Sequence, residues 1–592
     1  MKRIFYIFSI FIVIAICSCK KSFLDYTPNG VVSSSDLNSP AAIDALVISA
    51  YANLSNDFFL EQAFAIPWVF GSIRADDAYK GGGGVTDNSD QHIMETFYLL
   101  TPTSTGEVNG AWVALYENIG RTNEALRRLN STTEDQYPNK KESQAECRFL
   151  RAHWNFLLKI LFKHPVWASD SIAKSNLNTI SNRVYTSDQY WDKIADDFQF
   201  AIDNLPLVQT QVGRASKVAA EAYLAKVRLY QAYEQDESNN VTSINAAKLQ
   251  EVVNLCDSVI NSGTHHLNSD FAQNFLCGYD NTPESVFAVQ FSQNDGTLNG
   301  KIQLDCGVCY NMATQYGCCD FLNPSYSMLN AFKTDPLTGL PMFNNYNDNF
   351  LYNIDTWANV SDSALISSID WKTPTVDPRM DHTIGIPTHP WKYDPNFIMT
   401  KGWRRVPETY GYLTSMKSLE LYSSSCFVKL GPFMGTSRNA DIIRYDEVLL
   451  WKAEAEIELG QQISALPLIN QIRARAANSE NMLKRADNTP ISNYKINEYV
   501  DGVNCTWTQA FARQALQWED RLEFCTEGRR FFDLVRWGIA AETLNAYFAK
   551  EVQKWPFLAD AHFTKNRDEY LPIPQIQINF VKPGLYVQNN GW

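Results

Sequence analysis

Apolar residues recur at alternating steps of three and four through long parts of the chain, which is the spacing of one helix face. In residues 508–538 the periodic positions are Phe511, Ala515, Trp518, Leu522 and Cys525. Gly528 and Gly538 follow the two apolar runs of this segment, and glycine caps a helix well because it adopts the left-handed conformation cheaply. The pattern predicts two short helices joined by a tight turn, an αα-hairpin.

The same segment is unusually rich in charge for a stretch this apolar. Its charged residues include Arg521, Glu523, Arg529, Arg530, Asp533 and Arg536. Such residues at a helix junction form either a structural ion-pair network or a catalytic or anion-binding site. We favour the ion-pair network.

Helical periodicity also marks most of the first half of the chain. It predicts helices over residues 40–54, 106–129, 140–163, 187–205, 216–233 and 245–260. Further helices are expected within 441–477 and from the hairpin to about residue 548. Amphipathic helices in succession, with Ala at close contacts and aromatic residues beside them, indicate a mainly α, tetratricopeptide-like helix-pair solenoid.

Residues 264–440 differ from their surroundings. Helical periodicity fades there, and Gly, Pro, Asn, Asp and aromatic residues dominate. A structureless loop of this length would be improbable, so we expect an irregular, loop-rich inserted subdomain. The expected division is therefore a helical part over 19–263, this subdomain over 264–440, and a second helical part over 441–592.

The N-terminus carries a processing signal. Lys2 and Arg3 precede an apolar run that is too short to span a bilayer, so residues 1–18 are expected to be a signal peptide. Cys19 follows Ser18 in a bacterial lipobox pattern, and Cys17 fits that pattern less well. We expect the mature chain to be anchored in membrane lipid through an acylated Cys19.

Composition narrows the possible functions. The net charge of −14 and the isoelectric point of about 5.2 argue against binding to nucleic acid or to an anionic membrane surface. Aromatic residues reach 13%, with 15 Trp and 28 Tyr. That exceeds what a core requires, and amphipathic rings suit surfaces on which ligands stack.

Several motifs along the chain carry a family resemblance. They are the lipobox, Arg444 to Ala455, Asn470 to Ala476, Glu523 to Gly538, Leu571 to Pro574 and Gln588 to Trp592. Together and in this order they resemble the SusD/RagB family, the surface glycan-binding lipoproteins of Bacteroidetes-type bacteria. The sequence departs from the family at residues 519–522, where Glu-Asp-Arg-Leu stands in place of the usual Glu-Arg-Arg.

The resemblance implies a function as well as a fold. It implies four tetratricopeptide-like pairs that support a variable subdomain, with no catalysis and no cofactor. It also implies capture of an oligo- or polysaccharide at the outer membrane and delivery to a SusC-like TonB-dependent transporter. Sugar contacts vary within the family, so the resemblance transfers none of them and leaves the glycan unnamed.

Candidate sugar contacts come instead from residue chemistry. Sugars stack their C–H faces on Trp or Tyr and form hydrogen bonds with Asp, Asn and Arg. Two stretches are rich in both kinds of residue, 68–79 and 305–404. The expected glycan contacts are Trp68, Asp77, Tyr79, Tyr310, Trp371, Trp391, Trp403 and Arg404. Arg379 follows a proline in a family turn, and we interpret it as a structural anchor.

Two other functional classes stay open. A helical glycoside hydrolase would need two carboxyls about 5–10 Å apart, and the acidic pairs at 76–77, 196–197 and 519–520 are its candidates. No nucleophile elbow or zinc-protease motif accompanies them. The second alternative is a solenoid scaffold that only docks other proteins.

Four cysteines lie close together in sequence, Cys306, Cys309, Cys318 and Cys319. Zinc sites prefer two separated pairs of cysteines, so we expect no metal here and favour a disulfide, which an exported domain permits. The pairing and the redox state of these four are left open.

Overall fold

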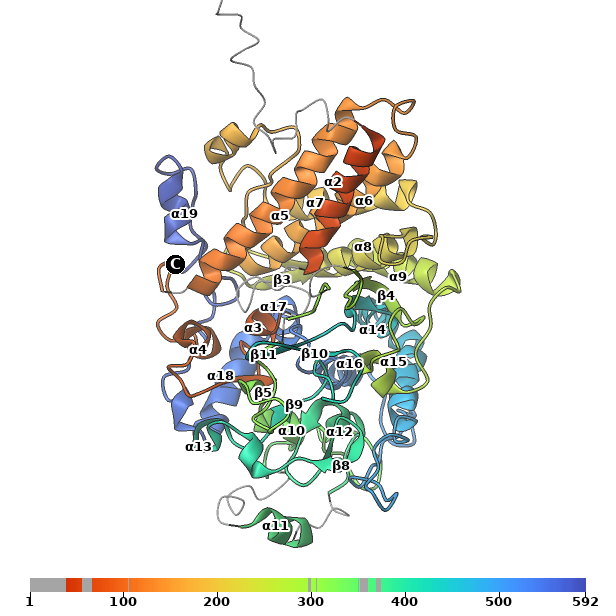
Figure 1. Ribbon diagram of the computed structural model, residues 1–592, viewed down its shortest axis with the longest axis vertical. Coiled ribbons are helices and arrows are strands. Elements are labelled where there is room, and N and C mark those ends of the chain that lie inside the picture. The colour runs from red at the N-terminus through yellow and green to blue at the C-terminus, as the bar shows by residue number, and fades with distance from the viewer. Residues whose placement is uncertain are drawn as a thin grey trace, which may run out of the picture.

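The computed structural model describes residues 39–55, 67–104, 106–296, 300–304, 306–349, 351, 360–368 and 374–592. Residues 1–18, Cys19 and Trp371 therefore lie outside the described residues. The fold is mainly helical, as predicted, with long helices gathered at one end of the molecule and a loop-rich part at the other (Figure 1).

The predicted series of amphipathic helices is confirmed. It comprises α2 (Pro40–Ala52), α5 (Gly106–Ser131), α6 (Lys140–Phe162), α7 (Ser187–Asn204), α8 (Lys217–Ala232) and α9 (Ala246–Asn261). From α5 to α9, each helix packs against the next one along the chain. Their contact faces carry the periodic apolar residues, such as Phe149 and Phe156 of α6, both of which are buried.

The C-terminal helices extend the same stack. α14 (Tyr445–Glu458) packs against α8 and α9, and α15 (Gln462–Ala477) and α16 (Gln509–Glu523) pack against α14. Helices from both ends of the chain therefore form one layer. The hydrophobic core runs through all three expected segments, so the boundaries at 263/264 and 440/441 stay a prediction.

One predicted helix begins later than expected. The sequence pattern places residues 441–444 in a helix, but they belong to strand β12 (Ala440–Arg444), which pairs antiparallel with β4 (Ser285–Val289). The adjacent β-branched residues Ile442 and Ile443 favour a strand. The helix starts only at Tyr445, where the Glu447 side chain caps the backbone N–H of Arg444.

The segment between the helical parts consists of loops, short helices and short two-stranded sheets. Its helices are α10 (Tyr326–Ala331), α11 (Asp362–Ser368), α12 (Arg379–Thr383) and α13 (Pro407–Tyr410). Its paired strands are β6 (Ile384–Gly385) with β9 (Thr414–Ser415), β7 (Pro390–Trp391) with β8 (Asp394–Ile398), and β10 (Phe427–Leu430) with β11 (Phe433–Thr436). This agrees with the predicted irregular character of the segment.

One small sheet joins the two stretches from which sugar contacts were predicted. β1 (Ala78–Gly81) pairs antiparallel with β5 (Phe321–Pro324), with Tyr79 opposite Asn323.

The remaining α-helices and strands of the described residues are α3 (Trp68–Gly71), α4 (Ser89–Thr96), β2 (Tyr233–Gln235), β3 (Val241–Ile244), α17 (Arg530–Arg536), α18 (Ala540–Glu551) and α19 (Gln575–Phe580).

The predicted αα-hairpin is present as α16 and α17. Gly528 between them has a φ of +77°, in the left-handed region that glycine tolerates. Its backbone lies against Gly71 of α3. A Cβ on Gly71 would collide with the backbone of Gly528, and a Cβ on Gly528 would collide with the backbone of Pro67. Among the described residues, none of the helices has the length and apolar character needed to span a bilayer.

Candidate functional site

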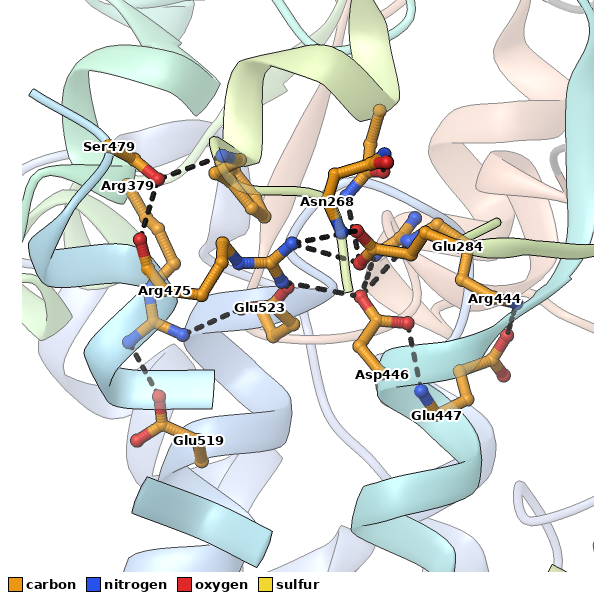
Figure 2. A network of polar contacts seen from close by, with 12 residues as sticks. Asn268, Glu284, Arg379, Arg444, Asp446, Glu447, Arg475, Ser479, Glu519 and Glu523 are labelled. Carbon is orange, nitrogen blue, oxygen red and sulfur yellow. Dashed lines mark hydrogen bonds and ion pairs between the residues drawn. The ribbon is translucent and has the colours of Figure 1, made fainter. Parts of the chain in front are cut away.

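A buried network of ion pairs includes Glu519 and Glu523 of α16, the first helix of the hairpin (Figure 2). The Arg379 guanidinium of α12 lies 2.7 Å from Asp377, 2.7 Å from Glu519 and 2.8 Å from Glu523. Arg475 of α15 contacts Glu523 and lies 2.9 Å from Glu284. Buried charges are tolerated only when paired in this way. Arg379 is thus the structural anchor that its sequence context indicates.

Four arginines of the hairpin are also paired. Arg521 and Arg530 lie 2.8 and 2.9 Å from Asp76. Arg529 contacts Glu447, and Arg536 contacts Glu454. The interpretation of this segment as an ion-pair network is confirmed. It ties α16 and α17 to α14 and to the loop before β1.

Three buried carboxyls of this network resemble a metal-binding group. Oxygens of Glu284, Asp446 and Glu523 lie within 4.8 Å of one another. Arg475 contacts all three and already supplies the compensating positive charge. Burial raises the pKa of Asp446 to about 6, and the Glu523 charge adds to this against the pull of Arg444 and Arg475.

The first group of predicted sugar contacts lies in the interior. Trp68 packs against Phe321 with 6.4 Å between ring centroids, and Tyr79 donates its hydroxyl hydrogen to Glu551. The carboxylate of Asp77 faces the backbone of Thr526. Burial, together with the neighbouring Asp76 charge, raises the pKa of Asp77 to about 7.

The second group forms one aromatic cluster. The Tyr316 ring lies 5.1 Å from Tyr310 and 5.3 Å from Trp391, and the Trp403 ring lies 6.4 Å from Trp391. Phe397 closes the cluster at 4.5 Å from Trp403. We call these five residues the aromatic cluster.

Arg404, next to the cluster in sequence, is engaged elsewhere. Its Nε donates to Asp320 at 3.0 Å, and its Nη2 donates to Asn323 at 2.6 Å. Asn323 belongs to β5, so this contact braces the sheet that joins the two stretches.

The seven described candidates are all buried. None of Trp68, Asp77, Tyr79, Tyr310, Trp391, Trp403 and Arg404 is more than 9% exposed. A ring with no free face offers no surface on which a sugar can stack, so in this structure these side chains pack within the interior.

Tyr422 is an exposed residue whose ring packs on the aromatic cluster. Its side chain is 39% exposed, its ring lies 5.0 Å from Phe397, and its backbone N–H donates to the Tyr316 hydroxyl at 3.0 Å. Exposed Asn396 is adjacent to Phe397, and exposed Lys429 donates to the Tyr316 carbonyl at 3.1 Å. We call Tyr422, Asn396 and Lys429 the Tyr422 surface. It consists of one exposed ring and two exposed polar residues that each adjoin a member of the aromatic cluster.

The predicted thiol cluster is only partly joined. Cys318 is bonded to Cys319, whereas Cys306 and Cys309 are buried and lie outside this bond. A second disulfide joins Cys277 to Cys426, 149 residues apart in sequence. It links the segment that carries Tyr422 to Cys277, which lies between α9 and β4. The spacing of the cysteines in the sequence could not reveal this pairing.

Comparison with models of known protein families shows which family the chain belongs to. The family model described as the SusD family matches residues 283–592, and a model described as starch-binding associating with outer membrane matches residues 22–229. The chain belongs to the SusD family. The resemblance inferred from its ordered motifs is confirmed.

Similar proteins cover nearly the whole SusD-family chain. SusD-like protein P25 of Formosa agariphila is 21% identical over 98% of both chains. A SusD superfamily protein from Bacteroides vulgatus superposes with a TM-score of 0.66 at 20% identity, over 94% of this chain and 99% of that one. A laminarin binding SusD-like protein superposes with a TM-score of 0.61 at 19% identity, over 94% and 100%. These structures share the fold.

Sequence reasoning missed Tyr422 for an identifiable reason. It favoured Trp-rich stretches, and Tyr422 stands between Leu421 and three serines without a Trp nearby. The signal that was available is the turn composition of Ser423 to Ser425, which favours a surface loop and so an exposed neighbour.

Proposed function

We propose that this SusD-family protein captures an oligo- or polysaccharide at the outer cell surface and passes it, uncleaved, to a SusC-like TonB-dependent transporter. The observation that carries the proposal is the Tyr422 surface. It presents an exposed aromatic ring supported by Phe397, with exposed Asn396 and Lys429 next to members of the same aromatic cluster, on a fold shared with a laminarin binding protein. A flat ring with polar neighbours matches the apolar face and hydroxyl rim of a sugar.

The aromatic cluster gives this surface its rigidity. The Tyr422 ring rests on Phe397, and its backbone is held by Tyr316. A ligand therefore does not have to order the ring when it binds, which lowers the entropic cost of association. The β10–β11 hairpin and the Cys277–Cys426 bond hold the following residues.

One carboxylate of each acidic pair that suggested a hydrolase is held by a buried arginine, which supports binding without cleavage. Asp76 is paired with Arg521, Asp197 with Arg151 at 2.7 Å, and Glu519 with Arg473 at 3.1 Å. A carboxylate fixed by a buried arginine is a poor general acid, because the arginine stabilises its charged form.

Affinity electrophoresis on a panel of neutral and acidic polysaccharides tests the glycan claim. We expect retardation on at least one polymer, with Tyr422→Ala weakening it at least about tenfold, the loss typical of a central aromatic contact. Tyr98→Ala is the matched control, because Tyr98 is 48% exposed and lies outside the aromatic cluster. Equal affinities of both variants would place the glycan elsewhere.

The same samples separate the alternative functions. Reducing ends released from the bound polymer would indicate a glycoside hydrolase. Absence of retardation on every polymer would favour a docking scaffold. A pull-down from outer membranes tests the transporter, and failure to recover a TonB-dependent porin would contradict the delivery step.

The membrane anchor is tested at the N-terminus. Ser39, the first described residue, lies twenty positions after Cys19, and a chain of that length spans at most about 70 Å. We expect Cys19→Ser to abolish labelling by an alkyne fatty acid and to release the protein from membranes. Cys17→Ser is the control and should keep the label; loss of label in the control alone would move the anchor to Cys17.

A further inference from the structure

Three buried polar side chains meet where α6 ends, outside the Tyr422 surface. Lys163 directly follows α6, Asn239 lies in the turn between β2 and β3, and Glu569 lies between α18 and α19. Nζ of Lys163 donates to Oδ1 of Asn239 at 2.7 Å, and Nδ2 of Asn239 lies 3.5 Å from Oε2 of Glu569. Each of the three residues is at most 6% exposed. An amine, a carboxamide and a carboxyl are thus brought together away from bulk water.

The turn after β2 holds the amine against the carboxamide. Nζ of Lys163 also donates to the carbonyl of Asp236 at 2.6 Å, and the same carbonyl accepts the backbone N–H of Asn239 at 3.1 Å. Asn239 has a φ of +68°, in the left-handed region that asparagine adopts more readily than most residues. One carbonyl therefore positions both groups.

The distances suit an attack of the amine on the carboxamide carbon. Oδ1 is about 1.2 Å from Cγ in a carboxamide, so Nζ of Lys163 lies at most about 3.9 Å from Cγ of Asn239. Reacting atoms meet at about 3–3.5 Å, and a side-chain shift of less than about 1 Å brings them there. Holding the two groups in contact makes the reaction intramolecular, which removes most of its entropic barrier.

Lys163 is able to act as a nucleophile. Both hydrogen-bond acceptors of its Nζ are neutral, the Asp236 carbonyl and the Asn239 amide oxygen. Burial lowers the pKa of Lys163 to about 8, although nearby carboxylates act in the opposite direction. At pH 7 about a tenth of the amine is then neutral, and the neutral form carries the lone pair that a nucleophile needs.

Glu569 is placed to move the proton that the reaction requires. Its Oε1 accepts the backbone N–H of Asn566 at 2.9 Å, which leaves Oε2 facing the Asn239 amide. Burial raises the pKa of Glu569, against the hydrogen bonds that the carboxylate accepts. A carboxyl that retains its proton can donate it to a leaving nitrogen.

We propose that Lys163 and Asn239 join in an intramolecular amide bond, with Glu569 as the catalytic carboxyl. Nζ attacks Cγ of Asn239 and forms a new C–N bond, the bond from Cγ to Nδ2 breaks, and Nδ2 leaves as ammonia. Glu569 gives its proton to Nδ2 and takes up the proton that Nζ releases. Amine and carboxamide thereby become amide and ammonia, and no oxidant or second protein is consumed.

The bond would add a covalent link that the proposed glycan capture does not require. It joins residues 76 positions apart, the end of α6 and the β2–β3 turn. Closing such a loop restricts the unfolded chain in the way a disulfide does. Because the link is an amide, a reductant cannot open it.

Tryptic peptide mapping of the full chain in the presence of a reductant tests the bond. We expect Ile160–Lys174, uncleaved after Lys163, to be joined to Leu229–Lys248, with a mass one ammonia below the sum of the two peptides. Fragment ions should place the link at Lys163 and Asn239. Full recovery of both peptides in unlinked form, or a link at any other residue, would overturn the proposal.

A change at the electrophile tests the assignment of Asn239. Asn239→Ala removes the carboxamide, so both tryptic peptides should be recovered free. Asn240→Ala is the matched control, because Asn240 is the next residue of the same turn and its amide contacts Asp236 instead. It should keep the link. A link that persists in Asn239→Ala would overturn the proposal.

A time course of linked peptide after cell-free synthesis tests the role of Glu569. Glu569→Gln keeps the size of the side chain and removes the acid, and we expect it to slow bond formation at least about a hundredfold. Glu237→Gln is the control, because Glu237 lies in the same turn with 77% of its side chain exposed; it should react at the wild-type rate. Thermal melts confirm that each variant is folded. Equal rates in both variants would overturn the catalytic assignment of Glu569.

Discussion

Arg379 and Glu523 form a fully buried ion pair, with 2.8 Å between Nη1 and Oε2, across two parts of the chain. Arg379 begins α12 in the loop-rich segment, and Glu523 ends α16 of the hairpin. Neither side chain is exposed. Ion pairs as well as apolar packing therefore hold the loop-rich segment against the helical stack.

Removing Arg379 should destabilise the protein strongly. Arg379→Ala leaves Asp377, Glu519 and Glu523 without one of their cations in the interior, which costs about 3–5 kcal/mol. Urea unfolding measures the loss. Lys141→Ala is the control, because Lys141 and Glu134 form an exposed pair, 70% and 65% accessible, worth at most about 1 kcal/mol. Similar losses in both variants would contradict the role of Arg379.

Alanine substitutions at Gly71 and at Gly120 should change the stability of the protein in opposite directions. A Cβ on Gly71 would collide with the Gly528 carbonyl, and since both partners are backbone, Gly71→Ala should cost about 3 kcal/mol. Gly120 lies within α5 and has open space around it, so Gly120→Ala should stabilise by about 0.5–1 kcal/mol. Urea midpoints give both values. A tolerated Gly71→Ala would show that the two segments can separate.

Glu551 should make stability depend on pH. Burial raises the pKa of this carboxyl to about 7 from 4.5, against the hydrogen bond from Tyr79. The folded state then holds a proton that the unfolded chain has released. The contribution is fully present below pH 4.5 and is lost as pH rises through about 7, amounting to about 3 kcal/mol.

Glu551→Gln keeps a neutral partner for Tyr79 and removes the titration. The fall in melting temperature between about pH 5 and about pH 8 should therefore shrink in this variant. Glu542→Gln, on the exposed side of the same helix, should keep the wild-type profile. An unchanged profile in Glu551→Gln would assign the pH dependence to other carboxyls.

The Cys277–Cys426 bond should matter for both stability and binding. It closes a loop of 149 residues, so Cys277→Ser with Cys426→Ser should lower the unfolding free energy by about 2–5 kcal/mol. Glycan retardation should weaken as well, because Tyr422 lies four residues before Cys426. Cys505→Ser, at a half-buried free thiol, is the control. A wild-type urea midpoint in the double variant would mean that the bond does not form.

The helices could be predicted because their signal is local. α6 was expected over residues 140–163 and is observed over Lys140–Phe162, since its buried face repeats within the helix itself. The start of α14 was not predictable in this way. Ile443 fits the helical period, but pairing of β12 with the distant β4 overrides it.

The burial of the candidate sugar contacts could not be predicted from the local sequence. The Tyr79 ring is covered by Trp555 and Phe557, and its hydroxyl meets Glu551, 472 residues later. Likewise, the exposure of Tyr422 depends on Phe397 and Tyr316 lying beneath it. Composition points to aromatic residues, but only the three-dimensional arrangement separates the ring that faces solvent from those that are buried.

The hairpin also sets the order in which a growing chain can mature. Asp76 pairs with Arg530, which lies 454 positions downstream. The Asp76 carboxylate therefore lacks this cationic partner until nearly all of the polypeptide has been synthesised. Premature termination before α17 would leave interior carboxylates without partners and turn such fragments into substrates for proteolysis. The C-terminal helices are therefore needed to neutralise the interior charge of the N-terminal loops.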